Sequence, residues 1–369
     1  MILKELQLIN YRNYERQMIH LHPEVNLLIG ENAQGKTNAI EAIYMLAIGK
    51  SYRIQKDAPL IRYGETEATI EGDIVHGQRN TSLRLQLLQT GRRAAVNGVW
   101  QARMTDFIGN FQVVLFAPED LQLVKGSPSV RRRFLDVEIG QTYPKYLFHL
   151  NQFGKVMQQR NKILKSSHID FDYLSIFDIQ LVEHGTELLQ RRIQFLNQLQ
   201  PLSEKIYTDI AEGREVLTLS YVSTIPHFRL THQLSKGEIS IAFLDALTRS
   251  QQQDARFGST SVGPHRDDIE LLLDGRSVQL YASQGQQRTI ALSLRLAEIE
   301  LIHNEIGEYP VLLLDDVLSE LDDLRQRNLV LSMSEKVQTM ITSTGLFGLS
   351  NELQERARLF HVSSGIISR

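Results

Sequence analysis

Residues 25–48 read VNLLIGENAQGKTNAIEAIYMLAI, an apolar run followed by a glycine-rich loop and a helix-forming segment. The run at residues 25–29 predicts a short buried strand. Apolar residues at positions 40, 43, 46 and 47 form one face of a helix over residues 36–48, and Gly49 is placed to end it. A strand, a loop and a helix in immediate succession indicate an α/β fold.

The loop between this strand and helix fits the pattern G-x-x-x-x-G-K-[ST], in which glycines let backbone N–H groups face phosphate oxygens. Lys36 is placed to reach the β- and γ-phosphates, and the Thr37 hydroxyl is a ligand for Mg²⁺. The positive end of the following helix adds to the attraction for anions. The predicted ligand is ATP with Mg²⁺, bound by Gly30, Glu31, Asn32, Ala33, Gln34, Gly35, Lys36 and Thr37.

A second apolar run, residues 311–314, ends in two carboxylates, Asp315 and Asp316. A buried parallel strand places its last side chains at the carboxyl edge of the sheet, where ligands bind in open α/β folds. Asp315 is predicted to hold Mg²⁺, as the aspartate of a Walker B motif does. Asp316 is then the predicted catalytic residue that orients or deprotonates the attacking water, with Lys36 on the phosphates.

Residues 281–288, YASQGQQR, precede a long helix-forming segment and resemble the LSGGQ signature motif of the ATP-binding-cassette superfamily. In that superfamily the motif binds the γ-phosphate held by the other subunit. The resemblance therefore assigns nucleotide contacts to Ser283, Gly285 and Gln286. The alternative interpretation is a helix N-cap, where serine is common. Residues 319–322, SELD, resemble the D-loop of the same superfamily.

Strand and helix signals are unevenly distributed along the chain. Strand-like runs at 68–75, 82–89 and 93–101 predict a small antiparallel sheet, and residues 129–212 are rich in helix formers. We predict an ATPase lobe with a mixed sheet, made of an N-terminal half (residues 1–128) and a C-terminal half (residues 256–369). A mainly α-helical insertion (residues 129–255) separates the two halves. Lys36 and Ser283 lie 247 residues apart, a layout that resembles SMC-type ATPase heads more than transporter ATPases.

Composition narrows the class of protein. The 369 residues are 42% apolar and 22% charged, as in ordinary globular chains, and a chain of this length suggests about two domains. The absence of cysteine excludes disulfides, thiol nucleophiles and cysteine zinc sites. The charged start and the short apolar runs predict neither a signal peptide nor a membrane span, so we expect a cytoplasmic protein without a membrane partner.

Three further stretches accompany the ATPase motifs. They are LINYRNY at residues 8–14, PEDLQLVKGSP at 118–128 running on to RRRFLD at 131–136, and GPHRDD at 263–268. With these stretches the sequence resembles the RecF family of bacterial recombination mediators over essentially its whole length. Neither Glu119 nor Asp120 can be assigned as the glutamine-loop residue of the wider superfamily, although they are nearest to it by position.

The resemblance implies an ATP-dependent DNA-binding protein of recombinational repair, replication-fork maintenance and the SOS response. It implies an ATP-dependent homodimer with weak ATPase activity that binds single-stranded and duplex DNA at gaps and junctions. It also implies recruitment of RecR, with RecO, to load RecA. Two other functions remain open from the residues: the soluble ATPase subunit of a transporter, and a small-molecule kinase with the same phosphate loop.

The net charge of −3 excludes a polybasic DNA coat, so any DNA-binding surface must be local. Residues 125–165 contain nine basic residues and two acids. Within this basic patch, Arg131, Arg160 and Lys162 are candidate DNA contacts, with Arg160 and Lys162 favoured. The alternative is a solvated helix surface in which some of these residues pair with acids elsewhere.

Overall fold

This computed structural model describes residues 1–211, 213, 215–226, 234–318, 326, 329, 336–346 and 351–369. They divide into two compact units. The first joins Met1–Asp120 to Arg295–Arg369, and the second is Leu121–Leu294. These boundaries differ from the predicted ones, above all at the C-terminal side, where 256–294 belong to the second unit.

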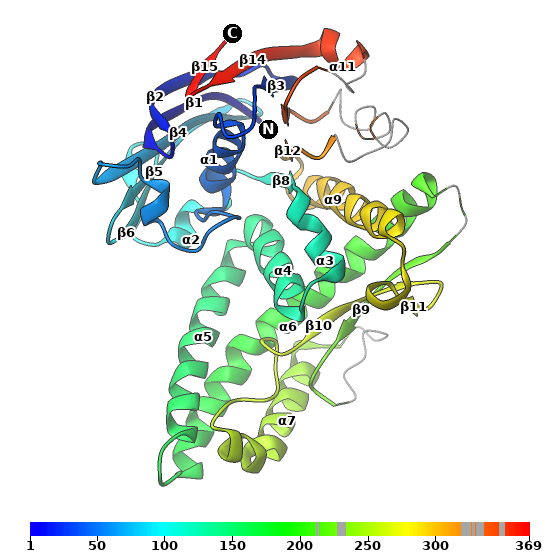
Figure 1. Cartoon of the computed structure of the whole chain (residues 1–369). Helices are drawn as coiled ribbons and strands as arrows, with labels where there is room; N and C mark the ends of the chain where they lie inside the picture. The colour runs from blue at the N-terminus through cyan, green and yellow to red at the C-terminus, as the bar shows by residue number, and fades with distance from the viewer. Residues whose placement is uncertain are drawn as a thin grey trace. The chain divides into compact units, whose positions relative to one another are not determined.

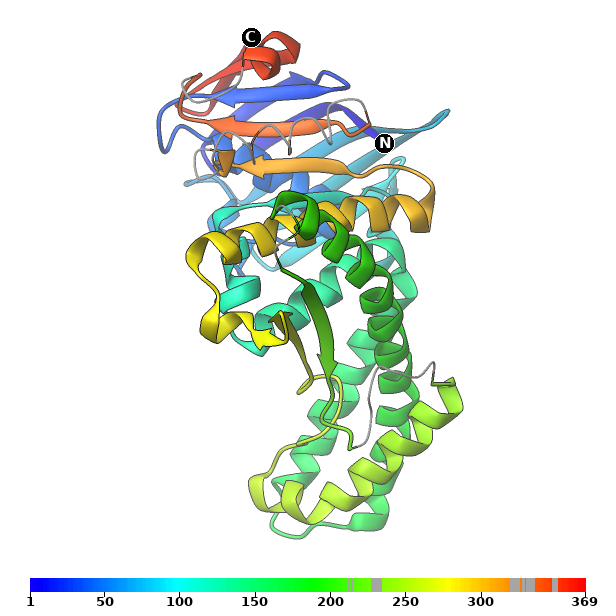
Figure 2. The same ribbon diagram turned by 90° about the vertical axis from the view of Figure 1, so that its right-hand side faces the viewer.

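The first unit contains a six-stranded sheet that is parallel except at one edge, in the order β15-β14-β3-β13-β12-β8. Every residue of β3, β8 and β12 is buried, as expected for strands covered on both faces. Figure 2 shows the red C-terminal strands, blue β3 and orange β13 stacked in this order. The strands are β3 (Val25–Ile29), β8 (Val113–Phe116), β12 (Val311–Asp315), β13 (Thr339–Ser343), β14 (Ala357–Ser363) and β15 (Ile366–Ser368).

A second sheet of the first unit is antiparallel, in the order β2-β1-β4-β5-β6-β7. The Asn97-Gly98 turn that closes its last hairpin has positive φ at both residues (50° and 79°), the backbone of a tight two-residue turn. The strands are β1 (Ile2–Tyr11), β2 (Tyr14–His20), β4 (Glu67–His76), β5 (Arg79–Leu88), β6 (Gly91–Val96) and β7 (Val99–Trp100).

Helix α1 (Lys36–Ile48) lies between the two sheets of the first unit and contacts strands of both. From Ala39 to Ile48 all its residues are buried, because the two sheets cover the helix on opposite sides, and Glu41 is the charged residue among them. Gly49 ends it in the left-handed conformation, as predicted. The part of this unit that the structure describes also contains the short helices η1 (Ala58–Leu60), α2 (Met104–Phe107), η2 (Pro118–Asp120) and α11 (Asn351–Arg356).

The second unit is mainly helical, and α5, α6 and α7 pack along one another (Figure 1). Leu189, Ile193, Leu196 and Leu199 form a buried apolar seam along α6. Pro201 lies inside this helix without ending it, and the buried face resumes at Ser203 and Tyr207. The helices are α3 (Leu121–Lys125), α4 (Pro128–Thr142), α5 (Pro144–Leu164), α6 (Phe171–Ile210) and α7 (Lys236–Phe257).

The second unit also contains a small sheet, which explains why this unit extends to Leu294 and not only to the predicted residue 255. Strand β10 (Asp268–Leu273) pairs on one side with β9 (Leu217–Val222) and on the other with β11 (Arg276–Ser277). Residues 268–277 therefore fold with the strand that follows α6. Two helices come next, α8 (Val278–Tyr281) and α9 (Gln284–Ile306).

Candidate nucleotide-binding and active site

The phosphate loop joins β3 to α1 and needs its glycines. A Cβ atom on Gly30 would lie 2.2 Å from the carbonyl oxygen of Val362, which leaves no room for a side chain. Gly35 has φ of +125°, outside the conformations that other residues adopt readily. Ala33 also has positive φ (65°), so the loop bends sharply between the two glycines.

The first hairpin of the chain braces this loop through two side chains. Asn13 Nδ2 donates to the carbonyl oxygen of Gln34 at 2.8 Å, and the Tyr14 hydroxyl donates to that of Gly35 at 2.8 Å. The backbone N–H of Gly365 also donates to Gln34, at 3.1 Å. Residues 8–14, which stand out in the sequence only through the family resemblance, thus support the phosphate loop through Asn13 and Tyr14.

Lys36 is buried, and its side chain turns back over the loop. Its Nζ donates to the carbonyl oxygens of Gly30 (2.7 Å) and Glu31 (2.9 Å). Burial lowers the pKa of Lys36, while the carboxylates of Asp316 and Asp315 oppose that shift. The ammonium group is thus held by two carbonyl oxygens of the loop, within the electrostatic influence of both predicted acids.

Three hydroxyl groups converge on the buried carboxylate of Asp315, at the carboxyl end of β12. Thr37 Oγ1 and Thr342 Oγ1 donate to Oδ1 at 3.0 and 2.9 Å, and Tyr52 Oη donates to Oδ2 at 2.7 Å. Burial, reinforced by Asp315, raises the pKa of Tyr52 well above its usual range. The structure therefore brings together Thr37 and Asp315, the two predicted Mg²⁺ ligands, and places Tyr52 beside them.

Asp316 follows directly and adopts the left-handed conformation, with φ of 56°. Its backbone N–H donates to Thr342 Oγ1 at 2.9 Å, so one threonine of β13 holds both acids. Positive φ is uncommon outside glycine, although aspartate tolerates it, and such backbone strain clusters at functional sites.

The donor set around Asp315 fits a hard divalent cation. A carboxylate and a threonine hydroxyl 3.0 Å apart are the oxygen ligands that Mg²⁺ prefers. Mg²⁺ in such sites is held by one or two protein oxygens together with the phosphates of the substrate. Thr37 and Asp315 are therefore the residues that would hold it.

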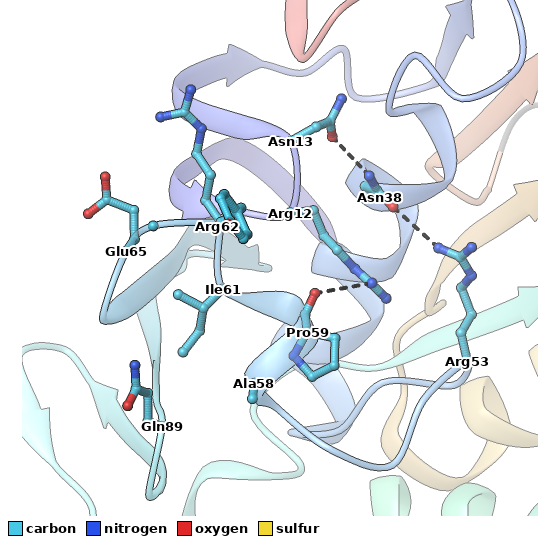
Figure 3. A pocket seen from close by; sticks show the side chains of 12 residues that line it. Arg12, Asn13, Asn38, Arg53, Ala58, Pro59, Ile61, Arg62, Glu65 and Gln89 are labelled. Atoms are coloured by element: carbon cyan, nitrogen blue, oxygen red, sulfur yellow. Dashed lines mark hydrogen bonds between the residues drawn. The ribbon is translucent and has the colours of Figure 1, made fainter.

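A cavity of about 840 Å³ opens beside the start of α1 (Figure 3). Arg12, Asn38 and Arg53 line one side, and Arg53 Nη1 donates to Asn38 Oδ1 at 3.2 Å. Buried Glu41 accepts hydrogen bonds from Arg12 at 2.8 and 2.9 Å, which fixes that guanidinium. The cavity thus presents guanidinium groups, which can stack on aromatic rings and pair with anions.

The predicted signature loop lies in the second unit, at the start of α9. The Ser283 hydroxyl accepts from the backbone N–H of Gln286 at 3.3 Å, and Gln286 Oε1 accepts from the Ser283 N–H at 2.7 Å. This is a reciprocal capping box, so the N-cap interpretation of Ser283 is confirmed. Ser283 and Gly285 are also exposed, so the helix N-terminus faces solvent.

Comparisons with known proteins show the family of this chain. The family described as RecF/RecN/SMC N terminal domain matches residues 2–368. The protein named DNA replication and repair protein RecF from Bacillus thuringiensis (strain Al Hakam) is 45% identical over 371 residues, which cover 100% of this chain and 98% of that protein. The chain belongs to the RecF family.

Relatives of solved structure support the same family and fold. A protein described as the recombination mediator protein RecF-ATP in the RecFOR pathway is 34% identical, with a TM-score of 0.92. The match covers 100% of this chain and 97% of that one. An Smc head bound to the C-winged helix domain of ScpA has a TM-score of 0.55 at 14% identity, covers 100% of this chain and 96% of that one, and shares the fold. The predicted SMC-head-like α/β fold is confirmed.

The candidate DNA contacts of this RecF-family chain need correction. Arg160 is fully buried, and its guanidinium pairs with Asp178 (2.6 Å) and Asp254 (2.7 Å). Arg131 is buried as well and pairs with Asp268 at 2.7 Å. Neither side chain can reach a DNA phosphate, because breaking such a buried pair costs about 3–5 kcal/mol. Lys162 is exposed on α5 and stays a candidate.

The structure also places the two glutamine-loop candidates, Glu119 and Asp120. Asp120 is buried and accepts from the Ala117 N–H (2.8 Å) and from Arg295 (2.6 Å), which gives it a structural role in the first unit. Glu119 is exposed just after β8, which pairs with β12, so it lies at the same sheet edge as Asp315.

The predicted D-loop, residues 319–322, lies outside the described residues. Among the described residues, no helix is long and apolar enough to span a bilayer.

Proposed function

We propose that this RecF-family protein is an ATP-switched, DNA-binding dimer of recombinational repair. The observation that carries the proposal is the hydrogen bond from Thr37 of the phosphate loop to Asp315 at the end of β12. Relatives named DNA replication and repair protein RecF, and a solved RecF-ATP structure of the RecFOR pathway, support it. Family membership favours this function over the transporter subunit and the small-molecule kinase.

ATP binding follows from the chemistry of the loop. The N–H groups of residues 33–37 and the start of α1 offer donors to the phosphates. Lys36, now bonded to two carbonyl oxygens of the loop, exchanges them for β- and γ-phosphate oxygens. The cavity beside Arg12 and Arg53 takes the ribose and base.

Hydrolysis needs a group that orients or deprotonates water, and Asp316 is placed for that role. Mg²⁺ bound at Thr37 and Asp315 supplies charge neutralisation on the phosphates. Aspartate reaches less far than glutamate, so turnover is slow and ATP acts mainly as a switch. The exposed Ser283 loop, flanked by exposed Leu280 and Tyr281, binds the γ-phosphate held by a second copy of the chain.

Replacing Asp316 with asparagine should trap the dimer. Asparagine keeps the size of the side chain but accepts a proton far less readily, so water attack slows while Asp315 still holds Mg²⁺. We expect turnover to fall about 100-fold or more, with ATP-dependent dimers that outlast those of the parent. Sedimentation after a chase with excess ADP measures their lifetime, and dimers that decay at the parent rate would contradict the role of Asp316.

DNA binding is proposed for the exposed face of α5. This helix contains no acidic residue, and Lys155 and Lys162, two turns apart, are both exposed. Lysines at i and i+7 share a helix face and can contact phosphates of single-stranded or duplex DNA at gaps and junctions.

The double replacement of Lys155 and Lys162 with alanine should weaken DNA binding equally for all sequences. Each phosphate contact on duplex DNA contributes about −0.9 to the slope of log K against log salt, so the loss of two contacts should make the slope less negative by about 1.8. Salt titrations of a gapped duplex, with and without ATP, measure it, beside sedimentation for assembly. Lys205→Ala, an exposed lysine of α6, serves as the control. An unchanged slope in the double variant would remove α5 from the DNA surface.

Recruitment of RecR, with RecO and RecA downstream, is proposed on family grounds. The RecFOR pathway named for the solved relative is the support for these partners. Pull-down of RecR by the full chain, with and without ATP, tests the first step.

A further inference from the structure

Tyr52 lies in the segment between α1 and η1 and makes the shortest of the three hydrogen bonds to Asp315. Its hydroxyl donates to Oδ2 at 2.7 Å, whereas Thr37 and Thr342 both donate to Oδ1. The two oxygens of the carboxylate therefore have different partners. Oδ1 faces the phosphate loop, and Oδ2 is held from the side by Tyr52.

The segment that carries Tyr52 is fixed by buried groups. The Ser51 hydroxyl donates to Glu41 Oε1 at 2.6 Å and accepts from the backbone N–H groups of Arg53 and Ile54 at 3.0 Å. The ring of Tyr52 packs edge-on against Tyr44 of α1, with centroids 5.3 Å apart. Tyr52 is thus positioned independently of Asp315.

We propose that Tyr52 is a positioning residue for the divalent cation: its hydroxyl locks the Asp315 carboxylate so that Oδ1 points at the Thr37 hydroxyl. This inference rests on the proposed nucleotide site and adds a residue to it. A carboxylate with one oxygen tied down loses the freedom to rotate away from the metal position. Partners of this kind orient metal ligands in many proteins, and their loss typically reduces metal affinity 10- to 100-fold.

The test is Tyr52→Phe, which keeps the ring and its contact with Tyr44 but removes the hydroxyl. Mn²⁺ replaces Mg²⁺ as the probe and is titrated into the ADP complex of the full chain, with free Mn²⁺ followed by its EPR signal. We expect the Kd for Mn²⁺ to rise about 10-fold. Binding of ADP without metal, in EDTA, should stay at the parent value, because the phosphate loop is untouched. Tyr173→Phe, at an exposed position of α6, is the matched control.

Each outcome decides a different point. An unchanged Kd for Mn²⁺ in a folded Tyr52→Phe variant would overturn the proposal and leave Tyr52 with a packing role. A lower Kd would also overturn it, since the hydroxyl would then compete with the cation for Asp315. Failure of the parent chain to bind ADP in EDTA would instead contradict the proposed nucleotide site.

Discussion

Lys36→Arg should reduce ATP hydrolysis to background, the largest loss of activity that we expect from a single substitution. Lysine ends in a compact ammonium that fits between the carbonyl oxygens of Gly30 and Glu31. The guanidinium group of arginine is wider and planar. Because Asn13 and Tyr14 hold the backbone of the loop in place, this group cannot occupy the position of the lysine ammonium. Phosphate release under saturating ATP and Mg²⁺ measures the loss.

A matched control distinguishes a loss of ATP hydrolysis caused by the site from a general effect of a lysine-to-arginine change. Lys50→Arg changes an exposed lysine shortly after α1 and should leave turnover unchanged. Nucleotide affinity of Lys36→Arg can persist in part through the backbone N–H groups, so binding and hydrolysis should be measured separately. Parent-like turnover in Lys36→Arg would exclude Gly30–Thr37 as the catalytic phosphate site.

Ser283→Arg should abolish the ATP-dependent dimer while leaving nucleotide binding by the single chain nearly intact. The reason is steric: an arginine at the exposed start of α9 fills the space where the γ-phosphate of the partner chain docks. The phosphate loop belongs to the other unit of the chain, so its own hydrogen bonds are unaffected. Sedimentation velocity with ATP and Mg²⁺ measures the dimer fraction.

This substitution also removes a helix cap, and that effect needs a control. Losing the Ser283–Gln286 capping box costs about 1 kcal/mol of stability. Ser235 forms the same kind of capping box with Glu238 at the start of α7, so Ser235→Arg removes an equivalent cap elsewhere in the second unit. We expect normal ATP-dependent dimers from Ser235→Arg. A normal dimer from Ser283→Arg would refute binding of the γ-phosphate in trans.

Local patterns in the sequence were sufficient for the elements that carry the nucleotide site. Strand β3 and helix α1 begin and end where the sequence analysis placed them, because an apolar run, a glycine loop and a helical face lie next to each other in the chain. The Asn97-Gly98 and Asp274-Gly275 turns are of the same local kind, because two residues that tolerate positive φ are enough to form each turn. In such segments the sequence neighbours are also the neighbours in space.

The distribution of charge along the sequence predicted the DNA-contacting residues less well than the apolar pattern predicted the strands and helices. Residues 125–165 have an excess of positive charge, but Arg131 and Arg160 are neutralised by Asp268, Asp178 and Asp254, which lie outside that stretch. A count of nearby residues cannot include partners from distant segments. The guanidinium group suits buried ion pairs, whereas lysine is strongly hydrated and stays exposed, as Lys162 does.

Tyr52 escaped the sequence analysis for the same reason. Its partner Asp315 lies 263 residues further along the chain, and a tyrosine after a helix carries no motif. The only signal in the sequence was indirect: two acids at the end of a buried strand need hydrogen-bond donors, but the pattern does not say which residues supply them. Only the sheet order brings those donors to one place.

The strand order of the parallel sheet has a consequence for biosynthesis. Strand β3, which leads into the phosphate loop, lies between β13 and β14, and β12 lies beyond β13. A nascent chain that has just emerged from the ribosome therefore holds the loop on a strand with neither of its sheet neighbours. The backbone partner of Gln34 at Gly365 is translated later still. The ATP site can therefore form only after β13 and β14 have been translated, and until then β3 is an apolar strand without partners, the kind of segment that is prone to aggregate.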